Sequence, residues 1–134
     1  LDISKAVILL LIIKFNFSEY LFISSIAVFL GHVFPIWLKF KGGKGVATYV
    51  GILFCINIYL VIFFIVSWLI IFTLTKYSSL ASMLSALFVP LTSYFLLGDN
   101  NYYFYIIFGL LILITHRENI KRLKNNTESK TKIY

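Results

Sequence analysis

The sequence has little charge, little acid and almost no cysteine. Charged residues make up 13% of its 134 residues, with five Asp and Glu, two His and one cysteine, Cys55. A single cysteine excludes an intrachain disulfide and a thiolate metal cluster. His32 and His116 lie far apart and have no carboxylate at ligand spacing, which makes a poor metal site. The sequence therefore predicts no metal centre.

Apolar residues dominate instead. Hydrophobic residues make up 60% of the chain and the mean hydropathy is +0.94, values typical of an integral membrane protein. Lipid leaves a backbone only the helix or the closed barrel, and a spanning helix needs about 20 apolar residues. Barrel strands of alternating polarity are absent from the sequence. We therefore expect an all-α, polytopic helical bundle, with residues 1–134 forming a single membrane domain.

The apolar stretch 46–75 is the difficult one. Roughly 30 residues at about 1.5 Å each would make a helix of about 45 Å for a hydrocarbon core of about 30 Å. A single pass would also place the KFKGGKG loop and the basic tail on opposite sides, against the positive-inside tendency. A break near Asn57 resolves both problems, with 46–56 short or half-spanning. About six membrane helices are then predicted: 3–17, 20–38, 46–56, 58–75, 79–98 and 102–115.

This arrangement explains the lopsided charge, 12 Lys and Arg against five acids, by topology and not by nucleic-acid binding. Lys5, the loop, Lys76 and the tail fall on the cytoplasmic side, whereas Glu19 and Asp99 fall outside. Residues 116–134 are predicted to be a cytoplasmic basic tail that begins as a short amphipathic helix and frays beyond Asn125.

The KFKGGKG loop lies just before a helix that should begin near Val46. Glycines let consecutive backbone N–H groups turn toward one point, and the helix N-terminus adds positive charge, so the loop suits a phosphate. The candidate ligands are Lys41, Gly42, Gly43, Lys44, Gly45 and Thr48. It is not a nucleotide P-loop, because Lys44 is followed by Gly45 and not by Ser or Thr. The alternative is a flexible turn that carries topogenic lysines.

Two further positions are candidates. Pro35 should kink or terminate its helix, and His32 just before it either packs at the membrane interface or belongs to a site. His116 and Asn119 are spaced i, i+3 and would face one point on a continuing helix. The cations that follow on another stripe suit lipid headgroups or a stop-transfer anchor.

These motifs resemble a known family. The segment GHVFPIWLKFKGGKGVAT (31–48), with HRENIKRL (116–123) and Glu128, looks like the PlsY family, the bacterial membrane acyl-phosphate:glycerol-3-phosphate acyltransferases. KYSSLASM (76–83) is a weaker match. The resemblance implies that a fatty acyl group moves from acyl phosphate to glycerol 3-phosphate, without metal, coenzyme A or other cofactor. Lysophosphatidic acid and phosphate would be the products.

The resemblance also implies residue roles and a location. His116 and Asn119 would orient glycerol 3-phosphate or stabilise developing charge, the glycine loop would bind phosphate, and His32 and Glu128 would support the site. The protein would be a multi-pass protein of the bacterial inner membrane, in contact with lipid, with its site and C-terminus in the cytoplasm.

The match departs from the family at its start. Family members carry another cytoplasmic motif, with a serine, an asparagine and an arginine, after a helix that would lie upstream of Leu1. We therefore expect an N-terminally truncated member, or one piece of a split enzyme whose upstream fragment is a separate partner. Two alternatives remain open: an inactive family fragment, and a small transport or channel subunit that gathers anions at its basic mouth.

Overall fold

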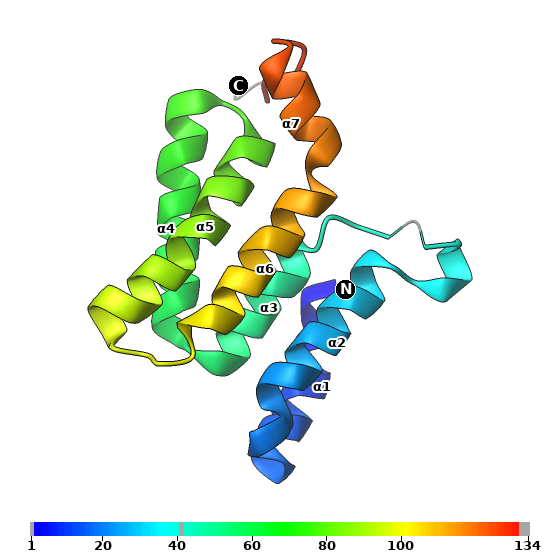
Figure 1. Ribbon diagram of the computed structural model, residues 1–134, viewed down its shortest axis with the longest axis vertical. Helices are drawn as coiled ribbons and strands as arrows, with labels where there is room; N and C mark the ends of the chain where they lie inside the picture. The colour runs from blue at the N-terminus through cyan, green and yellow to red at the C-terminus, as the bar shows by residue number, and fades with distance from the viewer. Residues whose placement is uncertain (1, 41, 132–134) are drawn as a thin grey trace. The chain divides into compact units, whose positions relative to one another are not determined.

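The computed structural model describes residues 2–40 and 42–131, and only the backbone of residues 2, 3 and 37. Over these residues the protein is helical, with seven α-helices, two short 3-10 helices and no strand (Figure 1). It divides into two compact units, Leu1–Val61 and Ile62–Tyr134, which are described separately.

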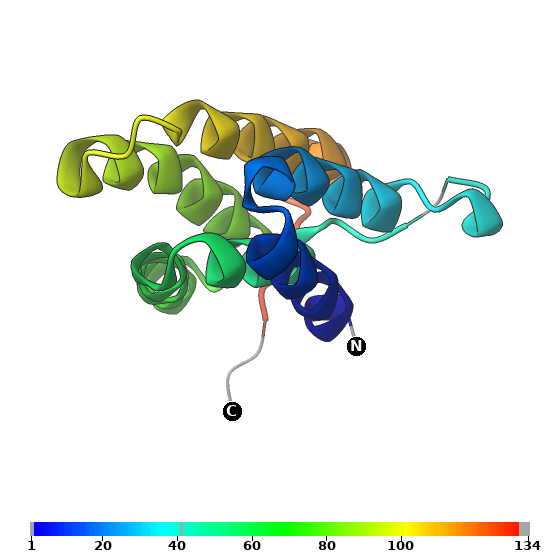
Figure 2. The same cartoon turned by 90° about the horizontal axis from the view of Figure 1, so that it is seen from below.

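The first unit contains α1 (Asp2–Asn16), α2 (Leu21–Val33) and α3 (Val46–Ile56). The 3-10 helix η1 (Ser18–Tyr20) joins α1 to α2, and η2 (Ile36–Leu38) follows α2. α1 packs against both α2 and α3, and the loop that contains η2 extends beyond the end of α2 (Figure 2). The first unit thus places its glycine loop between two helices that share α1 as a neighbour.

The predicted helical segment 20–38 is wrong in its last five residues, because α2 ends at Val33. Of the two effects expected of Pro35, to kink or to terminate the helix, the structure shows termination. Pro35 has no N–H to continue the helix and adopts an extended conformation, with φ −67° and ψ 126°. Lys39 and Phe40 then take positive φ angles of 51° and 61°, which turns the chain back. The result is a bent loop in place of the last helical turns.

The predicted break at Asn57 is confirmed. α3 ends at Ile56, α4 runs over Ile58–Thr75, and Asn57 between them is extended, with φ −152° and ψ 117°. Its side-chain Oδ1 accepts a hydrogen bond of 2.9 Å from the N–H of Tyr59. Asparagine is a preferred residue for capping a helix N-terminus in this way, so Asn57 both ends α3 and starts α4.

The second unit contains most of α4 with α5 (Ser78–Leu97), α6 (Tyr102–Thr115) and α7 (Arg117–Lys124). α5 and α6 lie side by side in both views (Figures 1 and 2). The Trp68 indole N–H on α4 donates to Ser82 Oγ on α5 at 3.0 Å. By length and composition, α4 and α5 are the two helices among the described residues that can each span a membrane.

Residues after α7 fold back within the second unit. The helix ends at Lys124, one residue before the predicted limit at Asn125, and a turn follows. The Thr131 N–H donates to the Lys76 carbonyl at 3.0 Å, and Lys130 Nζ lies 5.6 Å from the centre of the Tyr77 ring. The segment after the turn is therefore attached to the connection between α4 and α5, and it carries Glu128 with it.

Candidate functional site

The first unit contains a pocket of about 580 Å³ between α1, α2 and the glycine loop. Its polar lining comes from Lys5, His32, Thr48 and the backbones of Gly42 and Gly43, and most of the remainder is apolar. Four of these five residues were predicted from the sequence to belong to a site. Lys5 was predicted only as a topogenic charge, and its place in the pocket follows from the packing of α1.

Gly42 and Gly43 pack tightly against the end of α2. The Gly42 N–H donates to the Val33 carbonyl at 3.1 Å, and a Cβ at Gly42 would collide with the backbone oxygens of His32 and Val33. A Cβ at Gly43 would lie 2.5 Å from His32 Nε2. The two glycines are therefore needed for close packing, and the Gly42 N–H is engaged within the protein.

Gly45 has a different requirement. It precedes α3 with φ 81° and ψ −2°, a left-handed conformation that favours glycine, and a Cβ there would collide with the Phe29 ring. Among the described residues, no side chain caps this end of α3. The N–H groups of its first turn can therefore be satisfied by an anion.

Thr48 supplies the clearest sign of a ligand. It lies in the first turn of α3, is 1% exposed and lines the pocket. Its Oγ1 has no hydrogen-bond partner within the described part of the chain. Buried hydroxyl groups are normally hydrogen-bonded, so a bound ligand would satisfy this one.

The other predicted phosphate ligands lie differently. Lys44 is exposed, Gly45 is buried, and neither is among the described residues that line the pocket. Lys41 lies outside the described residues. The structure thus brings Gly42, Gly43 and Thr48 together with His32, and adds Lys5 as the cation on the pocket wall.

His116 belongs to the second unit, at the junction of α6 and α7, and is 2% exposed. Its Nδ1 lies 2.8 Å from the Ile112 carbonyl oxygen. A carbonyl can only accept a hydrogen bond, so Nδ1 is the protonated nitrogen and donates. In the neutral ring Nε2 is then the nitrogen that can take up a proton.

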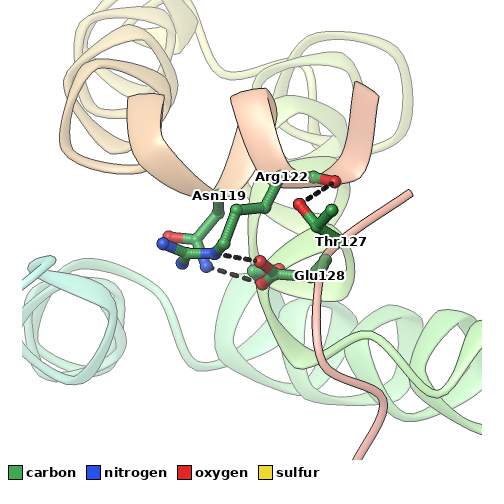
Figure 3. Close-up of polar contacts among 5 residues, drawn as sticks. Asn119, Arg122, Thr127 and Glu128 are labelled. Atoms are coloured by element: carbon green, nitrogen blue, oxygen red, sulfur yellow. Dashed lines mark hydrogen bonds and ion pairs between the residues drawn. The ribbon is translucent and has the colours of Figure 1, made fainter. Parts of the chain in front are cut away.

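Asn119 is 4% exposed and contacts a carboxylate from the folded-back segment (Figure 3). Its Nδ2 donates to Glu128 Oε1 at 2.7 Å, and the Ser79 hydroxyl donates to the same oxygen at 2.6 Å. Arg122 Nε donates to Glu128 Oε2 at 2.6 Å. Glu128 thus joins three elements of the second unit: α5, α7 and the segment that follows α7.

These contacts fix the charge of Glu128. Burial alone would raise the pKa of this carboxyl group, but hydrogen bonds from Ser79, Asn119 and Arg122, with the charge of Arg122, outweigh it and lower the pKa to about 2. Glu128 is therefore ionised at neutral pH and can only accept hydrogen bonds. No group of three or more His, Cys, Asp or Glu in the described residues is arranged to hold a metal ion.

Comparison with known proteins gives these features a context. The family model described as glycerol-3-phosphate acyltransferase matches residues 1–126. The chain is 61% identical over 135 residues to the glycerol-3-phosphate acyltransferase of Pelagibacter ubique, covering 100% of this chain and 70% of that protein. It is 41% identical to that of Bartonella henselae, covering 96% and 64% of the two chains.

Solved structures agree. The chain resembles the crystal structure of PlsY, described as an integral membrane glycerol 3-phosphate acyltransferase, in its glycerol 3-phosphate form. The TM-score is 0.88 at 34% identity, over 98% of this chain and 68% of that one. The lysophosphatidic acid form matches with the same TM-score. This chain spans about two thirds of the length of these proteins. The resemblance predicted from the sequence is confirmed: the protein is an integral membrane protein and belongs to the glycerol-3-phosphate acyltransferase family, PlsY.

Proposed function

We propose that the protein transfers a fatty acyl group from acyl phosphate to glycerol 3-phosphate, in the first acylation of phospholipid synthesis. The observation that carries the proposal is the pocket of the first unit. There the buried Thr48 hydroxyl lacks a partner among the described residues, beside a helix N-terminus without a side-chain cap. The names of the relatives, and the glycerol 3-phosphate and lysophosphatidic acid forms of the solved structures, support the same reaction.

The reaction requires little covalent chemistry from the protein itself. A hydroxyl oxygen of glycerol 3-phosphate forms the new ester bond to the acyl carbon, and the bond from that carbon to the phosphate oxygen breaks. The hydroxyl proton goes to the departing phosphate or to His116. Because acyl phosphate is already activated, the protein mainly positions the hydroxyl and stabilises charge on the carbonyl oxygen and the phosphate.

We assign phosphate binding to the glycine loop and the start of α3. Thr48 and the first-turn N–H groups of α3 supply donors, and Lys5 supplies charge. Gly42 and Gly43 shape the pocket, His32 supports it, and Gly45 turns the chain into the helix. Lys44 and Lys41, which flank the two glycines in the sequence, complete the proposed set.

We assign recognition of the glycerol moiety to His116 and Asn119. His116 presents Nε2 as the nitrogen that can accept a proton, and Asn119 orients the substrate. The location that suits this assignment is the cytoplasmic face of the bacterial inner membrane, with the C-terminus on the same side. The cationic face of α7, with Arg117, Lys121 and Lys124, suits anionic lipid headgroups there.

The test is phosphate release from palmitoyl phosphate by the detergent-purified chain, with and without glycerol 3-phosphate. We expect release that depends on glycerol 3-phosphate and is matched by lysophosphatidic acid. A second arm adds, as a separate polypeptide, the upstream helix and motif of a relative, because a split enzyme would need that partner. No phosphate release in either arm would favour an inactive family member. Anion movement across sealed vesicles without chemical change would favour transport.

A further inference from the structure

We propose that Glu128 is a positioning residue that fixes the direction of the Asn119 amide, so that Asn119 presents its oxygen to a hydroxyl group of the acceptor substrate. This inference rests on the proposed function and refines it. It separates the two roles open to Asn119, orienting the acceptor and stabilising developing charge.

The carboxylate of Glu128 is held from several sides. Oε1 accepts from Ser79 Oγ at 2.6 Å and from Asn119 Nδ2 at 2.7 Å, while Oε2 accepts from Arg122 Nε at 2.6 Å. The side chain of Glu128 is 8% exposed. Charge-assisted hydrogen bonds of this length are among the stronger ones in proteins, so the carboxylate has one well-defined orientation.

The backbone beside Glu128 is also held. The Thr127 N–H donates to the Arg122 carbonyl at 2.8 Å, and the Thr131 N–H donates to the Lys76 carbonyl at 3.0 Å. These bonds anchor the segment on both sides of Glu128, to α7 and to the connection before α5. Figure 3 draws a second bond on the α7 side, from the Thr127 hydroxyl to the same Arg122 carbonyl, at 3.4 Å. The position of the carboxylate therefore does not depend on the side chains alone.

An ionised carboxylate determines which end of an amide faces it. Because the carboxylate only accepts hydrogen bonds, the Asn119 amide must turn its NH₂ group toward Glu128 and its oxygen away. Figure 3 shows the nitrogen directed at Glu128 and the oxygen on the other side. Asn119 is 4% exposed, and its Oδ1 has no hydrogen-bond partner in the described part of the protein. A buried acceptor without a donor is costly, which indicates a ligand that donates.

The chemistry of the substrate identifies the donor. Ionised phosphate oxygens mainly accept hydrogen bonds, and so does a developing oxyanion, so neither pairs with Oδ1. A glycerol hydroxyl donates and does pair with it. Asn119 therefore recognises the hydroxyl end of glycerol 3-phosphate, and phosphate recognition is left to other residues.

The first test observes the amide itself. In nitrogen-15-labelled chain in detergent, we expect the Asn119 side-chain NH₂ protons to be shifted downfield and to exchange slowly, unlike those of exposed Asn125. Glu128→Gln should remove this signature, because its amide can rotate and donate. The matched control is Glu118→Gln on the exposed face of α7, which should preserve it. Asn119 protons like those of Asn125 in the wild type would overturn the proposal.

The second test measures ligand binding, so it can also be made on variants that no longer catalyse the reaction. Dissociation constants are measured for glycerol 3-phosphate and for propyl phosphate, which lacks both hydroxyls. We expect the preference for glycerol 3-phosphate to fall about 5- to 10-fold in Asn119→Ala and in Glu128→Gln, the worth of one hydrogen bond. The double variant should lose no more than Asn119→Ala, because Glu128 acts through Asn119. Glu118→Gln should retain the full preference.

The outcomes separate the two proposals. Three results would overturn the role given to Glu128 and Asn119. The first is a double variant in which the two losses add, and the second is a Glu128→Gln protein that keeps the wild-type preference for glycerol 3-phosphate. The third is a wild type that does not prefer glycerol 3-phosphate over propyl phosphate. If Glu128→Gln does not fold, the wild-type amide signature and the Asn119→Ala preference still decide it. If acyl transfer is absent while the preference for glycerol 3-phosphate is intact and depends on Asn119, only the proposed function is overturned.

Discussion

The Lys14 ammonium group donates a hydrogen bond of 2.8 Å to the carbonyl oxygen of Cys55, 41 positions later in the sequence. Cys55 lies in the last turn of α3, where carbonyl groups have no partner within the helix. Lipid cannot satisfy such groups, so a short helix that ends at Ile56 needs a donor from elsewhere. Lys14 on α1 supplies that donor.

Replacing Lys14 with methionine should therefore destabilise the first unit. The substitution keeps the length of the apolar stem and removes the donor, and we expect a loss of about 1–3 kcal/mol in the free energy of unfolding. This loss is measured by adding dodecyl sulfate stepwise to the protein in a mild detergent and following its unfolding. Lys39→Met removes the same charge from an exposed loop position and should change stability little. Equal effects of the two substitutions would contradict the prediction.

Two glycines of the first unit should respond to alanine with opposite signs. Gly31 lies in α2 and an added Cβ would meet no other atom within 4 Å, so alanine should stabilise by about 0.5–1 kcal/mol through helix propensity. Gly45 has φ 81° and faces the buried Phe29 ring. Alanine there should lower the free energy of unfolding by about 1–2 kcal/mol through left-handed strain, and by more through the collision with the ring. The same detergent titration compares them, and stabilisation by Gly45→Ala would refute the packing described for the loop.

Gly43→Ala and His32 should be coupled. The added methyl group would lie 2.5 Å from His32 Nε2, so Gly43→Ala should destabilise the wild type but not a protein that already carries His32→Ala. Thermal unfolding in detergent of the two single variants and the double variant gives the coupling. Independent effects would mean that the histidine ring does not pack on the loop. Activity lost by Gly43→Ala alone is therefore weak evidence for phosphate binding.

Thr48→Val tests phosphate binding more cleanly. Valine keeps the shape of threonine and removes a buried hydroxyl that lacks a partner among the described residues, so stability should be equal or higher. We expect weaker use of the phosphorylated substrates, with KM raised about 5- to 10-fold, the worth of one hydrogen bond. Thr92→Val serves as the control, because Thr92 is half-buried on α5 and its hydroxyl bonds to its own helix, at the Phe88 carbonyl. An unchanged KM in Thr48→Val would remove Thr48 from the site.

Glu128 should make stability fall in acid. Its pKa drops from the ordinary 4.5 to about 2 on folding, so the folded state favours the ionised form. The stability it contributes is complete above about pH 4.5 and is lost as pH falls toward about 2. Unfolding measured across this range should show a component that Glu128→Gln lacks and Glu118→Gln retains. A wild-type profile that matches Glu128→Gln would contradict the contacts described for this carboxylate.

Local and topological signals predicted much of the fold. The break between α3 and α4 followed from the length of an apolar run and the sides on which lysines must lie, and it falls at the predicted residue. The capping preference of Asn57 was a second signal, available in the sequence, that the prediction did not use. The end of α2 before Pro35 was expected, because proline cannot continue a helix. The 3-10 turn and the left-handed residues that follow were missed, because apolar composition alone does not distinguish a helix from a 3-10 turn.

Contacts between distant segments were not predictable in the same way. Lys5 lines the pocket because α1 packs beside α3, and the hydrogen bond from Ser79 to Glu128 joins residues 49 positions apart. No periodicity or spacing encodes such pairs. The glycine loop was interpreted through backbone freedom, whereas at Gly42 and Gly43 the structure shows a steric need for the absence of a side chain.

The attachment of the segment after α7 has a consequence for shortened forms of the protein. A protease cut or a premature stop between Asn126 and Thr127 leaves each helix of the described residues whole, because the last of them, α7, ends at Lys124. Membrane insertion and circular dichroism would look normal, yet Glu128 and the Thr131 contact with Lys76 would be gone. Such a shortened protein would still be expressed and inserted, yet its Asn119 amide would be free to turn around.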